Sequence, residues 1–262
     1  MIPRSRLRPV VLAYHGVNDP PADDRLGLVM SPEHLESQIR MLQRIGYSFV
    51  TADDLVDTGA DRPPAHGTAV LTFDDGWADA LTVALPVLER CRVRATFYVN
   101  PGLWGAQHHE IGGAAGRLLA EPEARALVDA GMDLGCHSFT HADLRGLSDA
   151  ALAAEVAQGR AGVEAITGRE CRTFAYPFGA HDARVEAAVR HAGFALAFAW
   201  LPGPWRAAAA PRLPAPTRHG GGRLLLKLLG IGRRRTVGPP PAAGSAPGEE
   251  TLTVRPVKGS AA

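Results

Sequence analysis

Cysteine and lysine are both scarce in this 262-residue chain. Its three cysteines, Cys91, Cys136 and Cys171, include no C-x-x-C pair. An odd number of cysteines without that spacing argues against a disulfide scaffold and against a cysteine-rich structural zinc site, and it favours a reducing compartment. Only Lys227 and Lys258 among the 28 basic residues are lysine, which we interpret as a bias of composition and not as the signal of a binding site.

An excess of charge of one sign is also missing, since the formal net charge is +1. The charge is unevenly distributed along the chain. Residues 218–262 contain eight basic and two acidic residues, a local charge of +6, so residues 1–217 carry about −5. A slightly acidic folded part excludes electrostatic binding of nucleic acid by residues 1–217.

No apolar run is long enough to cross a membrane, and residues 1–9 lack the apolar segment of a secretory signal. We therefore expect a cytoplasmic protein. Residues 218–262 are basic and rich in proline, glycine and alanine, which predicts a flexible C-terminal tail. Within this tail, the apolar run 224–229 beside the arginines 233–235 predicts either a helix docked on the folded domain or a short membrane-surface helix, the latter allowing peripheral contact with the inner membrane face.

Strand-like and helix-like segments alternate through residues 1–217, which we interpret as a single domain. Ser31 and Pro32 are typical of a helix start, and Gly46 is typical of its end. Pro86 lies in an expected helix over 77–91 and should bend that helix or shift its start. This alternation predicts an α/β fold, a parallel sheet covered by helices. The expected strands are 9–16, 47–50, 69–73, 95–99, 132–136, 171–176 and 194–200.

Candidate site residues stand where four of these strands end. They are His15, the pair Asp74 and Asp75, His137, and Phe178. Chemistry in parallel α/β folds collects at the carboxyl ends of the strands. We therefore expect these residues to share one site.

The adjacent carboxylates Asp74 and Asp75 allow two interpretations. With Gly76 they form an Asp-Gly turn that caps the next helix, or they are site carboxylates whose pKa values are pushed apart unless a cation lies near them. His137 and His141 favour the second interpretation, because imidazoles at i and i+4 on a helical turn point the same way, at a distance suited to one metal ion. Two histidines and one carboxylate with open positions are the usual ligands of a catalytic metal site.

Three motifs occur in order along the chain: T-F-D-D-G at 72–76, H-S-F-T-H at 137–141 and F-A-Y-P-F-G at 174–179. Together they resemble the polysaccharide deacetylase family with its NodB-type homology domain, over roughly residues 68–200. The resemblance implies a distorted (β/α) barrel with fewer strands than a TIM barrel. It also implies a metal-dependent hydrolase that removes the N-acetyl group from an N-acetylated amino sugar, in a glycan or a lipid-linked precursor, and releases acetate.

The resemblance further implies roles for the motif residues. Asp74 corresponds to the general base, and the backbone N–H of Phe178 corresponds to the contact for the oxyanion. The implied ion is a divalent metal, usually zinc, with cobalt or nickel as alternatives. Its implied ligands are Asp75, His137 and His141. Tyr176 and Pro177 are expected to shape the substrate groove.

Two departures from the family pattern concern the partners of the base. The family often has an arginine after the first aromatic residue of the third motif to orient the base, but Ala175 stands there, and Arg212 is a candidate replacement. The usual late Leu-x-x-His motif, the source of the general acid, is absent after residue 200. The opening Leu-Ala-Tyr-His at 12–15 instead resembles the branch of poly-N-acetylglucosamine deacetylases, which makes His15 the candidate general acid.

Two other functions agree with the same residues. An amide or imide hydrolase with a non-carbohydrate substrate would have a similar barrel and metal set, and a non-catalytic glycan-binding relative would keep the fold. The intact set of two carboxylates and two histidines argues against the latter. In the glycine-rich insertion 100–116, Trp104 is a candidate for stacking on a sugar ring. We interpret His108 to Glu110 as a substrate-side or solvated loop, with metal binding as the alternative.

Overall fold

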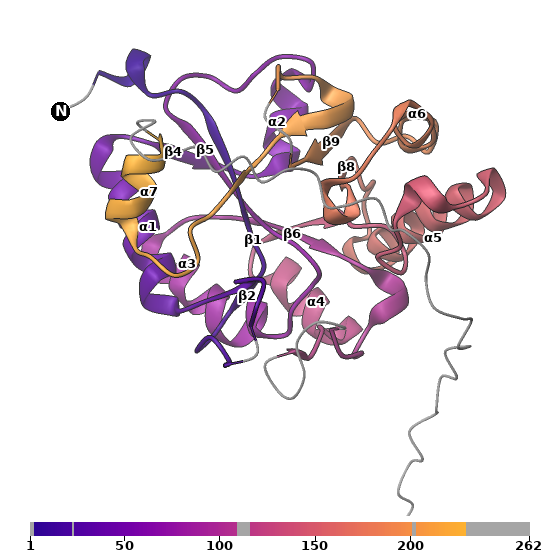
Figure 1. Ribbon diagram of the computed structural model, residues 1–262, viewed down its shortest axis with the longest axis horizontal. Helices are drawn as coiled ribbons and strands as arrows, with labels where there is room; N and C mark the ends of the chain where they lie inside the picture. The colour runs from indigo at the N-terminus through magenta and orange to yellow at the C-terminus, as the bar shows by residue number, and fades with distance from the viewer. Residues whose placement is uncertain (1–2, 23, 109–115, 201–202, 229–262) are drawn as a thin grey trace, which may run out of the picture.

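Most of the described strands form one curved sheet in which every strand pairing is parallel. A computed structural model describes residues 3–22, 24–108, 116–200 and 203–228. The strands that follow one another across the sheet are β1 (Val10–Tyr14), β5 (Thr68–Phe73), β6 (Thr96–Val99), β7 (Asp133–Cys136), β8 (Thr173–Ala175), β9 (Leu196–Ala199), β10 (Ala210–Pro211) and β11 (Leu213–Pro214). Their spatial order is β10-β9-β8-β7-β6-β5-β1-β11 (Figure 1). A further strand, β4 (Ser48–Val50), pairs with the first half of β5.

The two edges of this sheet meet at a single residue. Strands β10 and β11 lie at opposite ends of the order, yet only Arg212 separates them in the chain. The chain therefore passes from one edge to the other at Arg212, and the sheet curls into a nearly closed barrel. This confirms the expected distorted (β/α) barrel. The expectation of fewer strands than a TIM barrel is wrong, because eight described strands follow one another around it. A separate two-stranded pair, β2 (Gly16–Val17) with β3 (Val29–Met30), follows β1.

Apolar side chains fill both sides of the sheet, as a buried parallel sheet requires. Successive residues of a strand point to opposite faces. Leu12 and Leu71 belong to the larger hydrophobic cluster, between the sheet and the helices. Their neighbours Val11 and Val70 belong to a second cluster with Phe198, inside the barrel. The alternation explains why these strands are apolar throughout.

Helices surround the barrel (Figure 1). Their bounds are α1 (Pro32–Ile45), α2 (Ala52–Gly59), α3 (Leu85–Cys91), α4 (Glu121–Asp129), α5 (Asp149–Thr167), α6 (Ala183–His191) and α7 (Gly221–Leu228). Helices α1, α3 and α7 lie at the left of the barrel in Figure 1, and α5 and α6 lie at its right; all five pack on its outer face.

Local sequence signals account for where the helices begin. The Ser31 side chain accepts a hydrogen bond from the backbone N–H of His34, and Pro32 takes the first position of α1. Downstream of the T-F-D-D-G motif, a π-helical segment (Ala80–Ala84) leads into α3, whose first turn contains Pro86. The prediction that Pro86 bends this helix or shifts its start is confirmed, because proline has no N–H to donate to the preceding turn.

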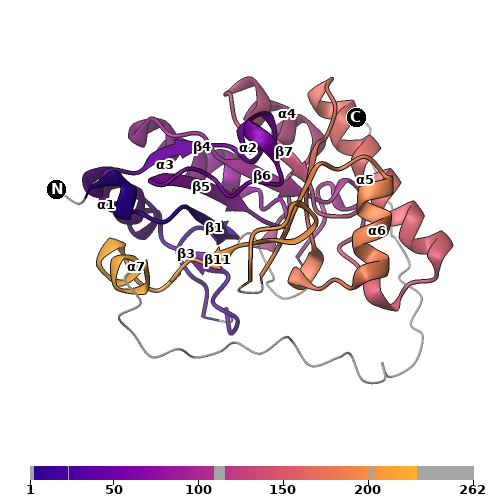
Figure 2. The same cartoon turned by 90° about the horizontal axis from the view of Figure 1, so that it is seen from above.

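Helix α7 is docked on α1 (Figure 2). Leu224 is fully buried there, and the backbone N–H of Gly221 donates to Ser37 Oγ at 3.0 Å. Residues 221–228 thus pack on the barrel, whereas the rest of the expected tail, 229–262 with its arginines 233–235, lies outside the described residues. None of the helices within the described ranges is long and apolar enough to cross a membrane.

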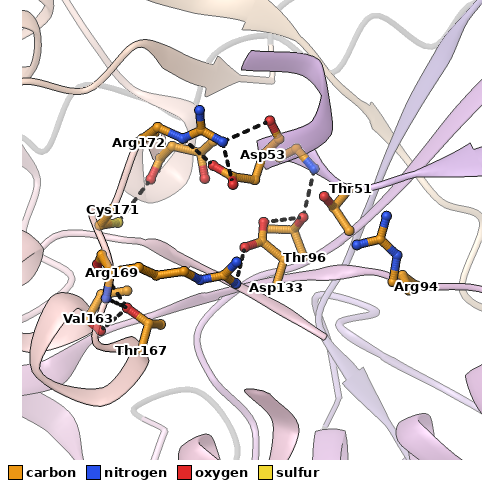
Figure 3. A network of polar contacts seen from close by, with 12 residues as sticks. Thr51, Asp53, Arg94, Thr96, Asp133, Val163, Thr167, Arg169, Cys171 and Arg172 are labelled. Carbon is orange, nitrogen blue, oxygen red and sulfur yellow. Dashed lines mark hydrogen bonds and ion pairs between the residues drawn. The ribbon is translucent and has the colours of Figure 1, made fainter. Parts of the chain in front are cut away.

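A polar network lies at the amino ends of the strands, opposite the carboxyl ends that carry the motifs (Figure 3). The Thr96 hydroxyl accepts from the Ala52 N–H at 2.8 Å and donates to the Asp133 carboxylate at 3.0 Å. Burial raises the pKa of Asp133 to about 7. At the same end, Arg172 binds Asp53 of α2. Because residues at this end of such barrels serve stability, we assign the network to the fold.

Candidate active site

Strand register brings the sequence motifs to one edge of the barrel. Tyr14 pairs with Phe73, so the residues that follow them, His15 and Asp74, leave the sheet side by side. The backbone confirms this, since the Asp74 N–H donates to the Tyr14 carbonyl at 2.9 Å. On the other side, Val99 pairs with Cys136 of β7, and His137 follows directly. The expected convergence at the carboxyl ends is thus observed.

Asp75, His137 and His141 form a compact group of potential metal ligands. One atom from each, taken from the described residues, lies within 4.8 Å of the others. Asp75 Oδ1 is 3.4 Å from His137 Nε2 and 3.2 Å from His141 Nε2, yet this buried oxygen has no hydrogen-bonding partner. An orphaned carboxylate oxygen that faces two imidazole nitrogens fits a divalent cation with Asp-His-His ligation.

The charge of the triad supports the same interpretation. Burial raises the pKa of Asp75, but the charge of His141 and the hydrogen bond from His108 to the other carboxylate oxygen outweigh burial, so the pKa lies well below its usual value. His137 Nδ1 is 2.7 Å from the carbonyl oxygen of Ala175. A carbonyl can only accept, so Nδ1 carries the hydrogen and Nε2 presents its lone pair to the site.

The two histidines are joined by a loop and not by the helical turn expected from their spacing. Ser138 and His141 both have positive φ, 65° and 60°, which no helical turn contains. Asn100, at the end of β6, donates to the carbonyl of His137. Glu155 of α5 accepts from the backbone N–H groups of Phe139 and Thr140 at 3.0 and 2.9 Å. Neighbouring elements therefore impose the loop conformation that places both imidazoles together.

Unusual backbone conformations gather at this site. Among the described residues other than glycine, five have positive φ, and four of them carry or flank the site: Asp75, Ser138, His141 and Phe178. The fifth, Arg92, ends helix α3. Each such residue costs about 1–3 kcal/mol, and such strain persists at functional sites where the surroundings enforce it.

Asp74 is paired with the arginine at which the barrel closes. Arg212 Nη1 and Nη2 donate to the two Asp74 oxygens at 2.6 and 2.7 Å, and Nη1 also contacts Thr72 Oγ1 at 3.1 Å. Both charged side chains are almost fully buried. Burial raises the pKa of Asp74, but the charges of Arg212 and His137 lower it by more, so the net shift of this pKa is downward. The carboxylate therefore stays ionised beside the triad.

His15 lies at the same edge, half-buried, with its ring edge against Trp200 at a centroid distance of 5.5 Å. Burial lowers the pKa of His15, and the negative charges of Asp75 and Asp74 oppose this only in part. The structure thus brings His15 to the triad, as the N-terminal strand end predicted.

In the third motif, the side chains that are exposed to solvent are not those that we expected to shape the groove. Tyr176 and Pro177 are buried, and the Tyr176 hydroxyl donates to the Ala208 carbonyl at 2.7 Å. These two residues therefore pack beneath the surface of the site and do not line an open groove. Phe178 is 40% exposed, and its ring meets that of His141 at 4.6 Å. Only Phe178 of the three presents its ring at the surface.

Residues of the insertion after β6 take different places. Trp104 is half-buried and packs against the hydrophobic core. His108 is buried, and its Nε2 lies 3.2 Å from Asp75 Oδ2, so the expectation of a solvated loop is wrong at this position. Residues 109–115, which include the rest of the His-His-Glu segment, lie outside the described residues. The motif His108 to Glu110 was the only sequence signal for this contact.

Fold and site together define a class of protein, a parallel (β/α) barrel with an Asp-His-His metal-binding triad at the carboxyl ends of its strands. The chain belongs to the polysaccharide deacetylase family, whose sequence pattern matches residues 61–197.

Individual relatives are distant. YxkH of Bacillus subtilis, named as a polysaccharide deacetylase homologue, is 22% identical over 194 residues, which are 74% of this chain and 64% of YxkH. The chain thus spans less than two thirds of that relative. The Streptococcus pyogenes deacetylase PplD, solved with acetate, superposes with a TM-score of 0.72 at 21% identity, over 85% of this chain and 98% of PplD. IcaB from Ammonifex degensii has a TM-score of 0.67 at 24% identity, over 79% and 91% of the two chains.

Proposed function

We propose that this protein is a metal-dependent hydrolase that removes the N-acetyl group from an N-acetylated amino sugar and releases acetate. The observation that carries the proposal is the orphaned Asp75 oxygen facing two histidine nitrogens, next to the ionised Asp74. Membership of the polysaccharide deacetylase family supports the reaction type. Binding of acetate by PplD is consistent with the proposed product.

Asp75, His137 and His141 would hold the ion, with zinc our first candidate for that set of ligands. A divalent ion bound there supplies Lewis-acid chemistry, polarising the acetamide carbonyl and lowering the pKa of water. Asp74, kept ionised by Arg212, takes a proton from the attacking water.

The other two groups act on the substrate's oxygen and nitrogen. The backbone N–H of Phe178 would donate to the oxygen on which negative charge develops. Protonated His15 would give its proton to the leaving amine. Its lowered pKa makes the imidazolium a stronger acid toward that amine.

The substrate we infer is an amino sugar in a glycan or a lipid-linked precursor, as in the branch with the N-terminal Tyr-His element. The exposed Phe178 ring beside His141 offers an apolar wall at the site. Trp104, which is half-buried against the hydrophobic core, is the candidate for stacking on a second sugar ring. We place the reaction in the cytoplasm, at the inner membrane face if the basic tail contacts lipid.

Acetate release from a substrate panel tests the function. We expect purified protein to release acetate from N-acetylglucosamine oligomers or lipid-linked N-acetyl sugars. Chelation should abolish release because the triad then lacks its ion, and added zinc, cobalt or nickel should restore it. Release from cyclic imides or simple amides alone would replace the sugar substrate with a non-carbohydrate one. A protein that binds glycan but holds no divalent metal and releases no acetate would be a non-catalytic relative.

His15→Ala is expected to lower kcat by about 10²- to 10⁴-fold, the usual contribution of a general acid. Metal binding should be unchanged, because His15 is outside the group of ligand atoms found among the described residues. Steady-state kinetics with the best substrate of the panel measure the effect. His191→Ala, at an exposed histidine of α6, is the matched control. Full activity of His15→Ala would remove His15 from the mechanism.

A further inference from the structure

The second oxygen of Asp75 has its own pair of partners on the side away from the two histidine ligands. Asp75 Oδ2 lies 3.3 Å from Trp77 Nε1 and 3.2 Å from His108 Nε2. An ionised carboxylate can only accept, so both nitrogens carry the hydrogen of their contact. The carboxylate is thus held by one oxygen, while its other oxygen faces the histidine pair.

His108 is itself held from two directions. Its ring stacks on the Trp77 indole, with a centroid distance of 4.5 Å and an interplanar angle of 29°. Its backbone N–H donates to the Gly116 carbonyl at 2.7 Å. The side chain is only 5% exposed. Stacking, backbone bonding and burial leave the imidazole little freedom to turn away from Asp75.

The strip 117–119 ties the base of the insertion to the T-F-D-D-G motif. The Leu119 N–H donates to the Gly76 carbonyl at 2.7 Å, and the Ala78 N–H donates to the Arg117 carbonyl at 2.9 Å. On its other side, the Leu118 N–H donates to Ala106 at 2.9 Å, two residues before His108. Backbone hydrogen bonds therefore join the described residues 106–108 and 116–119 to the turn that carries Asp75.

We propose that His108 is a positioning residue that orients Asp75 and thereby raises the affinity of the centre for its metal ion. The proposal rests on the proposed role of Asp75 as a ligand. His108 acts through Asp75 and is outside the group of mutually close ligand atoms found in the described residues. Outer partners of this kind typically contribute 10- to 100-fold in metal affinity.

Cobalt affinity and the cobalt absorption spectrum of the purified full chain test this role without any turnover. His108→Ala should weaken binding of Co²⁺ by about 10- to 100-fold, measured by competition with a chromophoric chelator. His108→Gln should recover much of that affinity, because its amide nitrogen reaches toward Asp75 much as Nε2 does. The visible spectrum should shift in His108→Ala, since a freed carboxylate changes the ligand geometry.

Two comparisons separate this proposal from the proposed function. His66→Ala, at an exposed loop histidine, should leave cobalt binding unchanged. His141→Ala should abolish it. If His141→Ala abolishes binding but His108→Ala and His108→Gln both bind cobalt as the wild type does, the positioning role is overturned and the metal centre stands. If His141→Ala also binds normally, the metal centre itself fails and this proposal fails with it.

Should His108→Ala not fold, Trp77→Phe removes the other donor to the same oxygen and should weaken binding in the same direction.

Discussion

Asp74→Asn is expected to reduce acetate release by about 10²- to 10⁴-fold while the protein still binds its metal ion. The substitution keeps the shape of the side chain but removes the charge and the basic oxygen that would take a proton from water. The ligand atoms are unaffected, because Asp74 is not one of the mutually close set among the described residues. Turnover and metal content, measured on the same preparation, check both halves of the prediction.

The neighbouring carboxylate is the matched control for this experiment. Asp75→Asn makes the same chemical change one residue further along and should lose the metal as well as the activity. Asp74→Asn also leaves Arg212 buried without an opposite charge, so its stability must be measured and activity compared at a temperature where it is folded. An Asp74→Asn enzyme with more than about a tenth of the wild-type rate would contradict the assignment of the base.

Arg212→Met is expected to lower the free energy of unfolding by about 3–5 kcal/mol, the cost of leaving one partner of a buried ion pair alone. Methionine fills a similar space between the Tyr98 and Phe198 rings, over which the guanidinium lies at 5.6 and 6.0 Å. The same change removes the charge that holds down the pKa of Asp74. Activity near neutral pH should therefore fall as well, because more of the base becomes protonated. Urea unfolding and kinetics as a function of pH measure the two effects.

Arg172→Met tests whether the large expected loss of stability in Arg212→Met comes from the burial of its ion pair. Arg172 binds Asp53 with comparable geometry, but the two side chains are 27% and 23% exposed, so we expect a loss of about 1 kcal/mol or less. The double variant Asp74→Asn with Arg212→Met removes both buried charges and should be more stable than Arg212→Met alone. Equal losses of unfolding free energy in Arg212→Met and Arg172→Met would contradict the prediction that the buried Arg212–Asp74 pair matters more for stability than the partly exposed pair.

Parallel sheets have a geometric property that places the ends of distant strands together. Every strand of this barrel runs the same way, so residues that follow the strands meet at one edge however far apart they are in sequence. Asp75 and His137 are 62 positions apart, yet they are in contact. The alternation of strands and helices therefore predicted the α/β fold, and the residues at the strand ends predicted one shared site.

The local backbone conformation at the site was predicted less well. The i and i+4 spacing of His137 and His141 is consistent with a helical turn and also with a loop. The segment 137–141 is a loop with two positive φ angles, imposed by Asn100 and Glu155 from other elements. Similarly, the aromatic Tyr176 has its hydroxyl bonded to the Ala208 carbonyl beneath the edge. None of these three partners is close in sequence to the group that it binds, so no local pattern could reveal them.

Residues that belong to a regular sequence pattern could be predicted from the sequence. Residues that are placed by closure of the barrel could be located only in the tertiary structure. Apolar strands and helix caps are local features, and they predicted a parallel α/β fold with Asp74, Asp75 and His137 at strand ends. The three motifs carried the family resemblance, which implied the barrel. Departure from the family pattern suggested Arg212 as the partner of Asp74, but its position depends on two-residue strands, β10 and β11, which are too short to show any periodicity. The contact of His108 with Asp75 depends on backbone hydrogen bonds from His108 to Gly116 and from Leu119 to Gly76. Both contacts arise only when distant segments pack, because burial and hydrogen bonding between them, and not local propensity, select their positions.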